Sequence, residues 1–592
     1  MQMLRIVLEP LLDKALTANG IHNQHWRSML VRSREHDQGD LSLPCFPFAK
    51  ELGKPPAEIA QMIAETLDSS DAIGEVNAVA GYLNVKANPV WLAEQVLLNA
   101  IRIGDAYGSK PVNDEHILVE HTSANPNGPF HVGRARNAIL GDTIVRLHRL
   151  HGNNVRAEYY VDDMGKQVAV LAWALKNLSA SDVEQTLSDR EPVNSKWQGK
   201  ADHERVRWYQ AAQAIRQDRA DKEQIEAEIS KMVHASEHGD EAVLKSFEDA
   251  YQPVLDGMLS TLKRLGIDFD TFTKESMFVT NGDVSRLMKQ FKTFDIHGVA
   301  ENGAEFLDLG ARGLKGKTEF FFRRGDGSSL YATRDIAYHM WKWQQCDRLI
   351  NVLGEDHKLQ AKQVGLTLAE LGEKIPDVLF YSFIKLPEGK MSTRKGNVVY
   401  MDDLLEEAQA QAAAVVSDIH PEYTPEMVAE IAEAAGTSAV RFNIIKVSPD
   451  KGFTFRWEEA LAFEGGSAPF IMYSHARACS IARKCAASGI DITSVLSEEA
   501  TIPSEMPKGL VELLRTLCIH HDILAKAVND RRPHLFANQL LQLATSFNAF
   551  YRDCMIMQDG KLNVFNFQIS ELARNLMRCS MEGLGILPVE QM

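Results

Sequence analysis

Two short motifs carry the side chains best suited to chemistry, and each follows a stretch with the pattern of a β-strand. The first is the segment HVGR at 131–134, which stands where a strand gives way to a helix. The free N–H groups and the positive dipole end of a helix N-terminus favour phosphate. Gly133 lets a flat base or a ribose approach the backbone, and His131 can donate a hydrogen bond to a phosphate oxygen. Taken alone, the pattern fits an ordinary helix start equally well.

The second motif is the segment KMSTRKG at 390–396, which carries the three cations Lys390, Arg394 and Lys395. Cations on a loop can stabilise the negative charge that spreads over the α-phosphate and the departing pyrophosphate when ATP is attacked. By itself, a basic loop is more often a solvated turn. Both motifs follow predicted strands, and together they favour an ATP site.

The elements that position these motifs predict an α/β fold. From Ile117 the pattern runs strand, glycine-bearing loop, helix and strand, a βαβ unit that implies a parallel sheet. Open sheets of this kind bind ligands at the carboxyl ends of their strands, where both motifs stand. After a polar helical stretch, the segments KTEFFFRR, RLINVLG and VLFYSFIKL are expected to continue the same sheet.

The chain is long enough for several domains, since single cores stop growing at about 250 to 300 residues. The prediction is a small N-terminal α+β domain, a Rossmann-like parallel-sheet catalytic domain with a mostly helical insertion, a helical connecting region and an all-α C-terminal domain. In that order, the predicted ranges are 1–110, 111–400 with the insertion at 171–265, 401–460 and 461–592. The segment 104–113 has the composition of a linker.

Composition narrows the class of protein. The net charge of −16 argues against indiscriminate nucleic-acid binding, yet the stretch 121–156 holds five arginines against Asp142, so a local basic surface is expected. The chain shows no apolar run of membrane-spanning length and no secretory signal. Its seven cysteines form no CxxC pair. We therefore expect a cytoplasmic protein with reduced thiols, no structural metal and no membrane partner.

Together the two motifs resemble the paired HIGH and KMSKS signatures of class I aminoacyl-tRNA synthetases, in the same order and context. The resemblance implies attack of an amino-acid carboxylate on the α-phosphorus of Mg-ATP, followed by transfer of the aminoacyl group to the terminal ribose of tRNA. ATP would be a substrate, with Mg²⁺ bound to it. Catalysis would rest on His131, Lys390 and Lys395. The ATP contacts implied within the two motifs are His131, Gly133, Arg134, Lys390, Met391 and Ser392.

A third segment stands at the same sheet edge. Gly354 and Asp356 lie in GEDH, directly after the predicted strand RLINVLG. They are expected to meet the adenosine ribose or the amino acid, with a helix cap as the alternative.

Two further elements resemble arginyl-tRNA synthetases, namely VEHTSANPN at 119–127 and YATRD at 331–335. The resemblance implies that Tyr331 and Asp335 hold a guanidinium, while Glu120, Asn125 and His131 contact the amino and carboxylate end of L-arginine. A carboxylate can accept the forked donors of a guanidinium two at a time, which a lysine ammonium cannot match. The alternative to a guanidinium-binding role is that Asp335 caps the start of a helix.

The resemblance extends to both ends of the chain, which look like a tRNA-contacting N-terminal domain and a helical anticodon-binding domain. It implies tRNA(Arg) as a partner and a monomeric enzyme. Arg134 departs from the second histidine of HIGH, and Thr393 from the second lysine of KMSKS. Three other hypotheses for the function stay open: a class I synthetase for another amino acid, a small-molecule nucleotidyltransferase, and a noncatalytic tRNA-binding paralogue.

Overall fold

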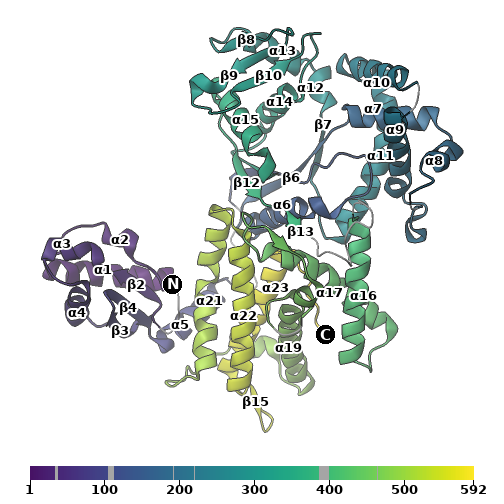
Figure 1. Cartoon of the computed structure of the whole chain (residues 1–592). Coiled ribbons are helices and arrows are strands. Elements are labelled where there is room, and N and C mark those ends of the chain that lie inside the picture. Colours follow the sequence, from purple (N-terminus) through teal and green to yellow (C-terminus); the bar gives the residue numbers. More distant parts are fainter. Residues whose placement is uncertain (34–37, 104–112, 191, 219–220, 386–398, 463–464) are drawn as a thin grey trace.

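The computed structural model describes residues 1–592 except 34–37, 104–112, 191, 219–220, 386–398 and 463–464. An N-terminal domain lies apart at one side, a sheet domain and a helical insertion lie at the top, and a C-terminal helical bundle lies below them (Figure 1). Within the described part of the chain, no helix is both long and apolar enough to span a membrane.

The N-terminal domain packs helices against a four-stranded antiparallel sheet of order β1-β2-β4-β3. Leu4, Leu8 and Leu12 recur every four residues along α1 and are buried, so this helix covers the core with one apolar face. The elements are α1 (Gln2–Ala18), α2 (Trp26–Met29), β1 (Val31–Arg32), β2 (Leu41–Pro44), α3 (Ala49–Leu52), α4 (Pro56–Thr66), β3 (Ile73–Val79) and β4 (Tyr82–Ala87). Helix α5 (Pro89–Ile103) then leads to the bundle, where it packs on α21 (Lys508–Asn529).

The predicted parallel sheet is present, with strand order β12-β11-β5-β6-β7. The strands are β5 (His116–Glu120), β6 (Asn154–Val161), β7 (Thr271–Lys274), β11 (Arg348–Gly354) and β12 (Asp377–Tyr381). Helix α6 (Val132–Leu150) crosses from β5 to β6, and its residues Leu140 and Ile144 are buried against both strands' apolar runs. The βαβ prediction is confirmed.

One strand prediction was wrong. KTEFFFRR forms β10 (Glu319–Arg323), which pairs antiparallel with β9 (Glu305–Asp308) in a separate sheet completed by β8 (His297–Val299). The alternation explains the difference, because Phe320 and Phe322 are buried while Phe321 is exposed. One-sided burial is typical of antiparallel sheets, whereas strands of a covered parallel sheet are apolar on both faces. The fifth parallel strand is instead the short polar TFTK of β7.

Helices fill the rest of the upper half. The insertion is built from α7 (Lys166–Asn177), α8 (Ala180–Thr186), α9 (Ala201–Asp218), α10 (Lys222–Glu237) and α11 (Glu241–Arg264), which pack on one another. Beside the antiparallel sheet lie α12 (Ser276–Thr280), α13 (Asp283–Phe291), α14 (Tyr331–Trp343) and α15 (Lys358–Glu370).

The C-terminal part is helical, as expected, and contacts the sheet domain through α6. Its main helices are α16 (Met401–Ile419), α17 (Pro425–Ile445), α19 (Ala468–Ala487), α21, α22 (Pro533–Asp553) and α23 (Val564–Gly583). The fully buried Arg441 of α17 pairs with Asp142 of α6 and donates to the Leu265 carbonyl at 2.8 Å. Smaller elements are β13 (Ile384–Lys385) paired with β14 (Phe453–Thr454), α18 (Trp457–Ala460), α20 (Ile492–Ser497), β15 (Met557–Gln558) and β16 (Lys561–Leu562).

Candidate active site

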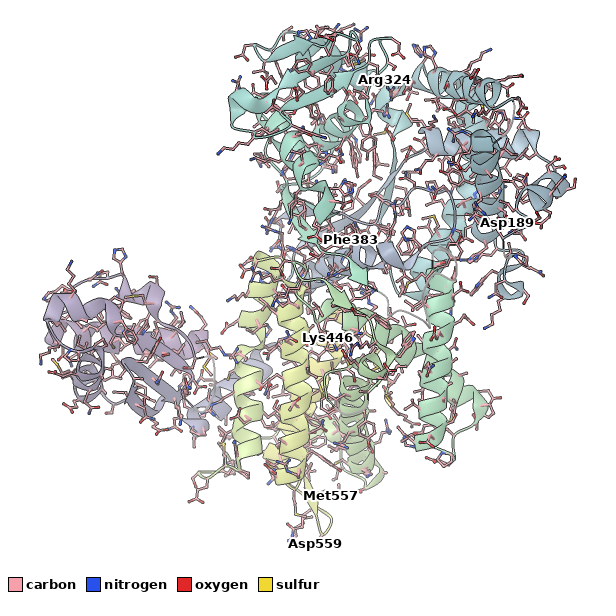
Figure 2. All side chains as sticks on the ribbon, viewed as in Figure 1. Asp189, Arg324, Phe383, Lys446, Met557 and Asp559 are labelled. Atoms are coloured by element: carbon pink, nitrogen blue, oxygen red, sulfur yellow. The ribbon has the colours of Figure 1, made fainter. Side chains whose placement is uncertain are left out.

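A cavity of about 650 Å³ opens at the carboxyl ends of β5, β6 and β11, beside the N-terminal half of α14. Phe383, on its rim, lies where the sheet domain meets the C-terminal helices (Figure 2). The cavity brings together nine of the residues predicted from the sequence: Glu120, Asn125, His131, Gly133, Arg134, Tyr331, Asp335, Gly354 and Asp356. The other four, Lys390, Met391, Ser392 and Lys395, lie outside the described residues.

The loop after β5 has an unusual backbone. Thr122 and Ser123 both have positive φ, at 68° and 38°, a conformation that costs L-residues roughly 1–2 kcal/mol each. Hydrogen bonds offset this cost: the Thr122 amide donates to Asn137 Oδ1 at 2.6 Å, and the Ser123 hydroxyl accepts from the Tyr160 amide at 3.1 Å. The resulting sharp turn leaves Glu120 facing the cavity. Strain of this kind concentrates at ligand sites.

His131 caps the start of α6 in an extended conformation, with φ −99° and ψ 152°. Its backbone forms an antiparallel bridge with Tyr400, flanked by hydrogen bonds from Val132 N to Val399 O at 3.0 Å and from Met401 N to Phe130 O at 2.8 Å. We call this paired segment, 130–132 with 399–401, the strap. The strap therefore joins the first motif to residues 399–401, a few positions after the second motif.

The His131 imidazole is half-buried, and burial together with the neighbouring Arg134 guanidinium lowers its pKa to about 4. At pH 7 the ring is therefore neutral and carries one N–H that can donate to a phosphate oxygen. Gly133 makes room for this ring, since a Cβ there would lie 3.0 Å from His131 Nδ1. The positive end of the helix dipole, a neutral donor and Arg134 together suit an anion.

Asp335 and Tyr331 stand one helical turn apart on α14. His339 Nδ1 lies 3.1 Å from Asp335 Oδ1. Burial acts to raise the pKa of Asp335, but the facing His339 and Lys342 outweigh it, so the pKa lies below its usual value and the carboxylate is ionised. The helix begins after Leu330, which rejects the interpretation of Asp335 as its cap. An ionised carboxylate facing a cavity is suited to a cation.

Glu120 is held by Lys342, a residue that the sequence analysis missed. The Lys342 side chain is fully buried, and its Nζ donates to Glu120 Oε2 at 2.6 Å and to Asn351 Oδ1 at 3.1 Å. It also lies 4.1 Å from the centre of the Tyr338 ring. A single lysine on α14 therefore fixes the carboxylate at the end of β5.

The same helix face holds a second missed side chain. His339 Nε2 accepts from Asn351 Nδ2 at 2.8 Å, which leaves Nδ1 as the protonated nitrogen; it donates to the Asp335 backbone carbonyl at 2.8 Å and lies 3.1 Å from Asp335 Oδ1. A signal for both residues was present in the sequence: positions 331, 335, 339 and 342 are spaced i, i+4, i+8 and i+11 and share one helix face. Other cavity residues that the analysis missed come from strand ends and α15: Tyr160, Asp162 and Gln360.

Asn125 connects the cavity to the helical insertion. Its side-chain amide donates to Gln167 Oε1 at 2.9 Å, and Asn127 donates to the same oxygen at 3.0 Å. Gln167 stands in the first turn of α7, where the insertion begins. The loop that carries Asn125 is thus fastened to the helices beyond the sheet.

Comparisons with known proteins agree along the whole chain. The family model for class I tRNA synthetases (R), catalytic domain, matches residues 95–457, the arginyl tRNA synthetase N terminal domain matches 7–87, and the DALR anticodon binding domain matches 471–592. The arginine--tRNA ligase of Methanocella arvoryzae is 40% identical over 95% of each chain. That of Archaeoglobus fulgidus is 37% identical over 94% of this chain and 96% of its own.

Solved structures give the same result. The Thermus thermophilus arginyl-tRNA synthetase has a TM-score of 0.77 at 26% identity, covering 99% of this chain and all of its own. The Plasmodium falciparum arginyl-tRNA synthetase, at 16% identity and a TM-score of 0.74, shares the fold over 99% of both chains. With three family models in order and full-length relatives above 30% identity, this chain belongs to the arginyl-tRNA synthetase family of class I aminoacyl-tRNA synthetases.

Proposed function

We propose that the cavity is the site at which this arginine--tRNA ligase joins L-arginine to ATP before transfer to tRNA(Arg). The observation that carries the proposal is the charge pattern of one cavity. Carboxylates on α14 and at the end of β5, and a helix start with a neutral imidazole, line the same cavity. Such a cavity can take a cation and a phosphate side by side.

The cationic end suits arginine. Asp335 supplies two oxygens to the guanidinium fork and Tyr331 a hydroxyl, while Glu120, Asn125 and His131 bind the amino and carboxylate groups. Asp335 Oδ1 lies 3.1 Å from His339 Nδ1, and the carboxylate still has lone pairs for the substrate, since each carboxylate oxygen accepts twice. This end selects for planar, forked donors and against an ammonium.

The anionic end suits ATP. His131, Gly133 and Arg134 contribute the helix start, and Gly354 and Asp356 contribute the end of β11 next to it. Lys390 and Lys395, with Met391 and Ser392, are assigned to the phosphates on the resemblance of their motif alone. Mg²⁺ enters as part of the ATP substrate, and no residue of this chain is assigned to it or to a structural metal.

Activation then needs no protein nucleophile, because the arginine carboxylate itself attacks the α-phosphorus and pyrophosphate leaves. The enzyme contributes orientation and charge stabilisation. The N-terminal domain at 1–110 and the helical domain at 461–592 contact tRNA, while 111–400 with its insertion at 171–265 carries the chemistry and 401–460 connects them. We further propose a monomer that works in the cytoplasm, on the family resemblance and the cysteine composition.

The test is ATP–pyrophosphate exchange with each amino acid, with and without total tRNA, on the chain and on its Asp335→Ala variant. We expect exchange with arginine alone, lost in the variant while ATP binding persists. Exchange by the variant at the original arginine KM would overturn the assignment of the guanidinium site. A lysine-dependent signal in the unmodified chain would overturn the proposed selectivity.

A further inference from the structure

We infer that Asp402, with His203 and Lys200, positions His131 from outside the cavity, so that the helical insertion sets the geometry of ATP binding. The inference deepens the proposed function and rests on the proposed role of His131. None of the three lines the cavity. They belong to a group at the junction of α9, α11 and α16, which we call the junction cluster: Lys200, which is partly exposed, and the buried Asp202, His203, Thr261 and Asp402.

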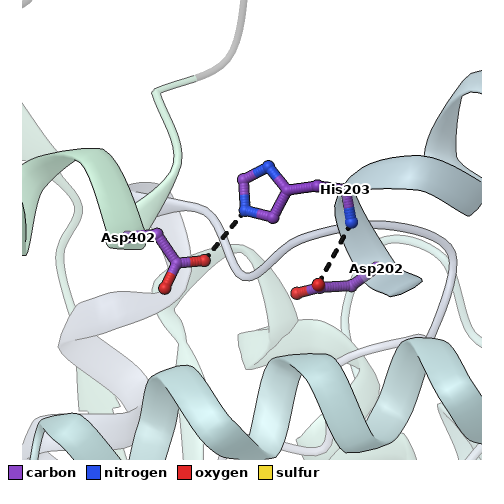
Figure 3. Close-up of side chains that lie close together, drawn as sticks. All are labelled: Asp202, His203 and Asp402. Atoms are coloured by element: carbon purple, nitrogen blue, oxygen red, sulfur yellow. Dashed lines mark hydrogen bonds and ion pairs between the residues drawn. The ribbon is translucent and has the colours of Figure 1, made fainter. Parts of the chain in front are cut away.

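Asp402 is the centre of the junction cluster. Its side chain is 1% exposed, and it accepts from Lys200 Nζ at 2.5 Å, from His203 Nε2 at 2.9 Å and from Thr261 Oγ1 at 3.0 and 3.1 Å. Figure 3 shows the bond from His203, which enters from the first turn of α9. Burial acts to raise the pKa of Asp402, but the bonds from His203 and Lys200 outweigh it and lower the pKa. Asp402 is therefore a charged acceptor that holds three donors.

The cluster also contains the donor set of a metal site, because Asp202, His203 and Asp402 offer ligand atoms within 4.8 Å of one another. Lys200 argues against a metal. Its Nζ lies 2.5 Å from Asp402 and 3.2 Å from Asp202, so an ammonium already supplies the cation between the two carboxylates. The junction cluster therefore joins helices through hydrogen bonds and ion pairs. Its effect on the cavity depends on the backbone contacts of the segment that carries Asp402.

Asp402 is the second residue of α16, directly after the strap. Met401 N donates to Phe130 O, and Tyr400 bridges His131, so the backbone beside Asp402 is hydrogen-bonded to the backbone of the His131 segment. The His203 ring also packs edge-on against the Tyr400 ring at 5.3 Å. A shift of α9 thus reaches His131 through one side-chain bond and one backbone ladder.

The direction of dependence follows from burial. His131 is half-buried and lines the cavity. His203 and Asp402 are buried among packed helices, where close packing restricts their side-chain conformations. The strap has few residues and only a short ladder, so its register relies on where α16 begins. Fixing Asp402 fixes that start.

The same interface offers a matched control. One turn further along α16, Glu406 accepts from Lys196 Nζ at 3.0 Å and from Arg264 Nη2 at 2.8 Å. These bonds also join the insertion to α16, but Glu406 lies beyond the strap and is partly exposed. Loss of Glu406 weakens the interface without releasing the strap.

The test compares His203→Phe, His203→Gln and Glu406→Gln in ATP–pyrophosphate exchange with arginine and tRNA. His203→Phe keeps a ring against Tyr400 but removes the donor, and Asp402 stays paired with Lys200 and Thr261, so folding is retained. We expect kcat/KM for ATP to fall about tenfold, because a catalytic group displaced by a fraction of an ångström loses rate steeply. The arginine KM should change less than twofold. His203→Gln, which restores an N–H donor, should recover most of the loss, and Glu406→Gln should match the unmodified chain.

A double-variant cycle separates positioning from general destabilisation. In a His131→Ala background, adding His203→Phe should cost less than twofold more, since the positioned group is already absent. A further tenfold loss there, equal rises in the ATP and arginine KM, or a Glu406→Gln defect as large as that of His203→Phe would overturn the inference. If His203→Phe is insoluble, Asp402→Asn replaces it, and the same changes in the ATP and arginine kinetics are expected. Should His131→Ala itself leave the ATP kinetics unchanged, the proposed function of His131 fails instead.

Discussion

Lys342 offers the sharpest test of how the arginine end of the cavity is held together. Replacing it by Met keeps most of the buried stem and removes the ammonium that pairs with Glu120 at 2.6 Å. Removing one partner of a buried ion pair costs roughly 3–5 kcal/mol. Glu120 keeps the Ser123 hydroxyl at 3.2 Å and a cavity-facing side chain that is 16% exposed, so the lower end, about 3 kcal/mol, is expected.

Urea unfolding at pH 7 measures this loss, and an exposed pair of nearly equal length supplies the control. Lys14 and Asp68 lie 2.7 Å apart with side chains 74% and 50% exposed. Lys14→Met should therefore cost less than about 0.5 kcal/mol, as expected for a solvated pair. The arginine KM of Lys342→Met should rise about tenfold, because the Glu120 carboxylate is no longer oriented.

A second substitution shows whether the charge itself is responsible. Glu120→Gln added to Lys342→Met leaves two neutral partners, so most of the lost free energy of unfolding should return. If Lys342→Met costs under 1 kcal/mol, or if the two substitutions add without recovery, the ion pair does not organise this end of the cavity.

Three further substitutions test other parts of the structure. Asp335→Asn should raise the arginine KM at least about 30-fold, since losing one charge of a hydrogen-bonded pair costs about 2 kcal/mol or more; an equal rise in the ATP KM would contradict the site assignment. Gly141→Ala should lower the free energy of unfolding by about 2 kcal/mol, because its Cβ would lie 2.2 Å from His121 Cβ. This clash outweighs the better helix propensity of alanine. A variant more stable than the unmodified chain would contradict the close packing of α6 on His121. Burial lowers the pKa of His148 to about 4, with Arg348 adding to the effect, so its contribution to stability is complete above pH 6.5 and is lost as the pH falls toward 4. His148→Gln, next to the Asn153 amide, should therefore lose about 2 kcal/mol less than the unmodified chain between pH 7 and pH 5 in urea unfolding, and identical pH profiles would refute this.

Local pattern predicted the parts of the fold in which one face or one run of residues decides the structure. The strand at 116–120 and the helix from Val132 could be predicted from the sequence, because an apolar run is followed by the pattern of a helix start. KTEFFFRR was misassigned because a run of phenylalanines looks continuous, although Phe321 faces solvent. Which sheet a strand joins depends on what covers it, and that lies elsewhere in the chain.

The candidate site shows the same division. Residues in motifs were found, and nine of them line one cavity. Lys342 and His339 were missed because their partners, Glu120 and Asn351, come from other elements, and a lone lysine or histidine on a helix is usually structural. The strap could not be predicted for the same reason, since its two halves are separated by the insertion, the antiparallel sheet and four strands of the parallel sheet.

In the proposed arginine site, selectivity depends on the side chains that surround Asp335. Asn351 donates to His339 Nε2, which forces the proton onto Nδ1, 2.8 Å from the Asp335 backbone oxygen and 3.1 Å from Asp335 Oδ1. His339 and Lys342 lower the pKa of Asp335 against the effect of burial, which keeps the carboxylate ionised with lone pairs left for a substrate. A guanidinium in the plane of the carboxylate can engage both oxygens, whereas an ammonium leaves one buried acceptor unpaired, at a cost of about 1–3 kcal/mol. In the proposed site, the discrimination therefore depends on Asn351 and His339 as well as on the Asp335 carboxylate.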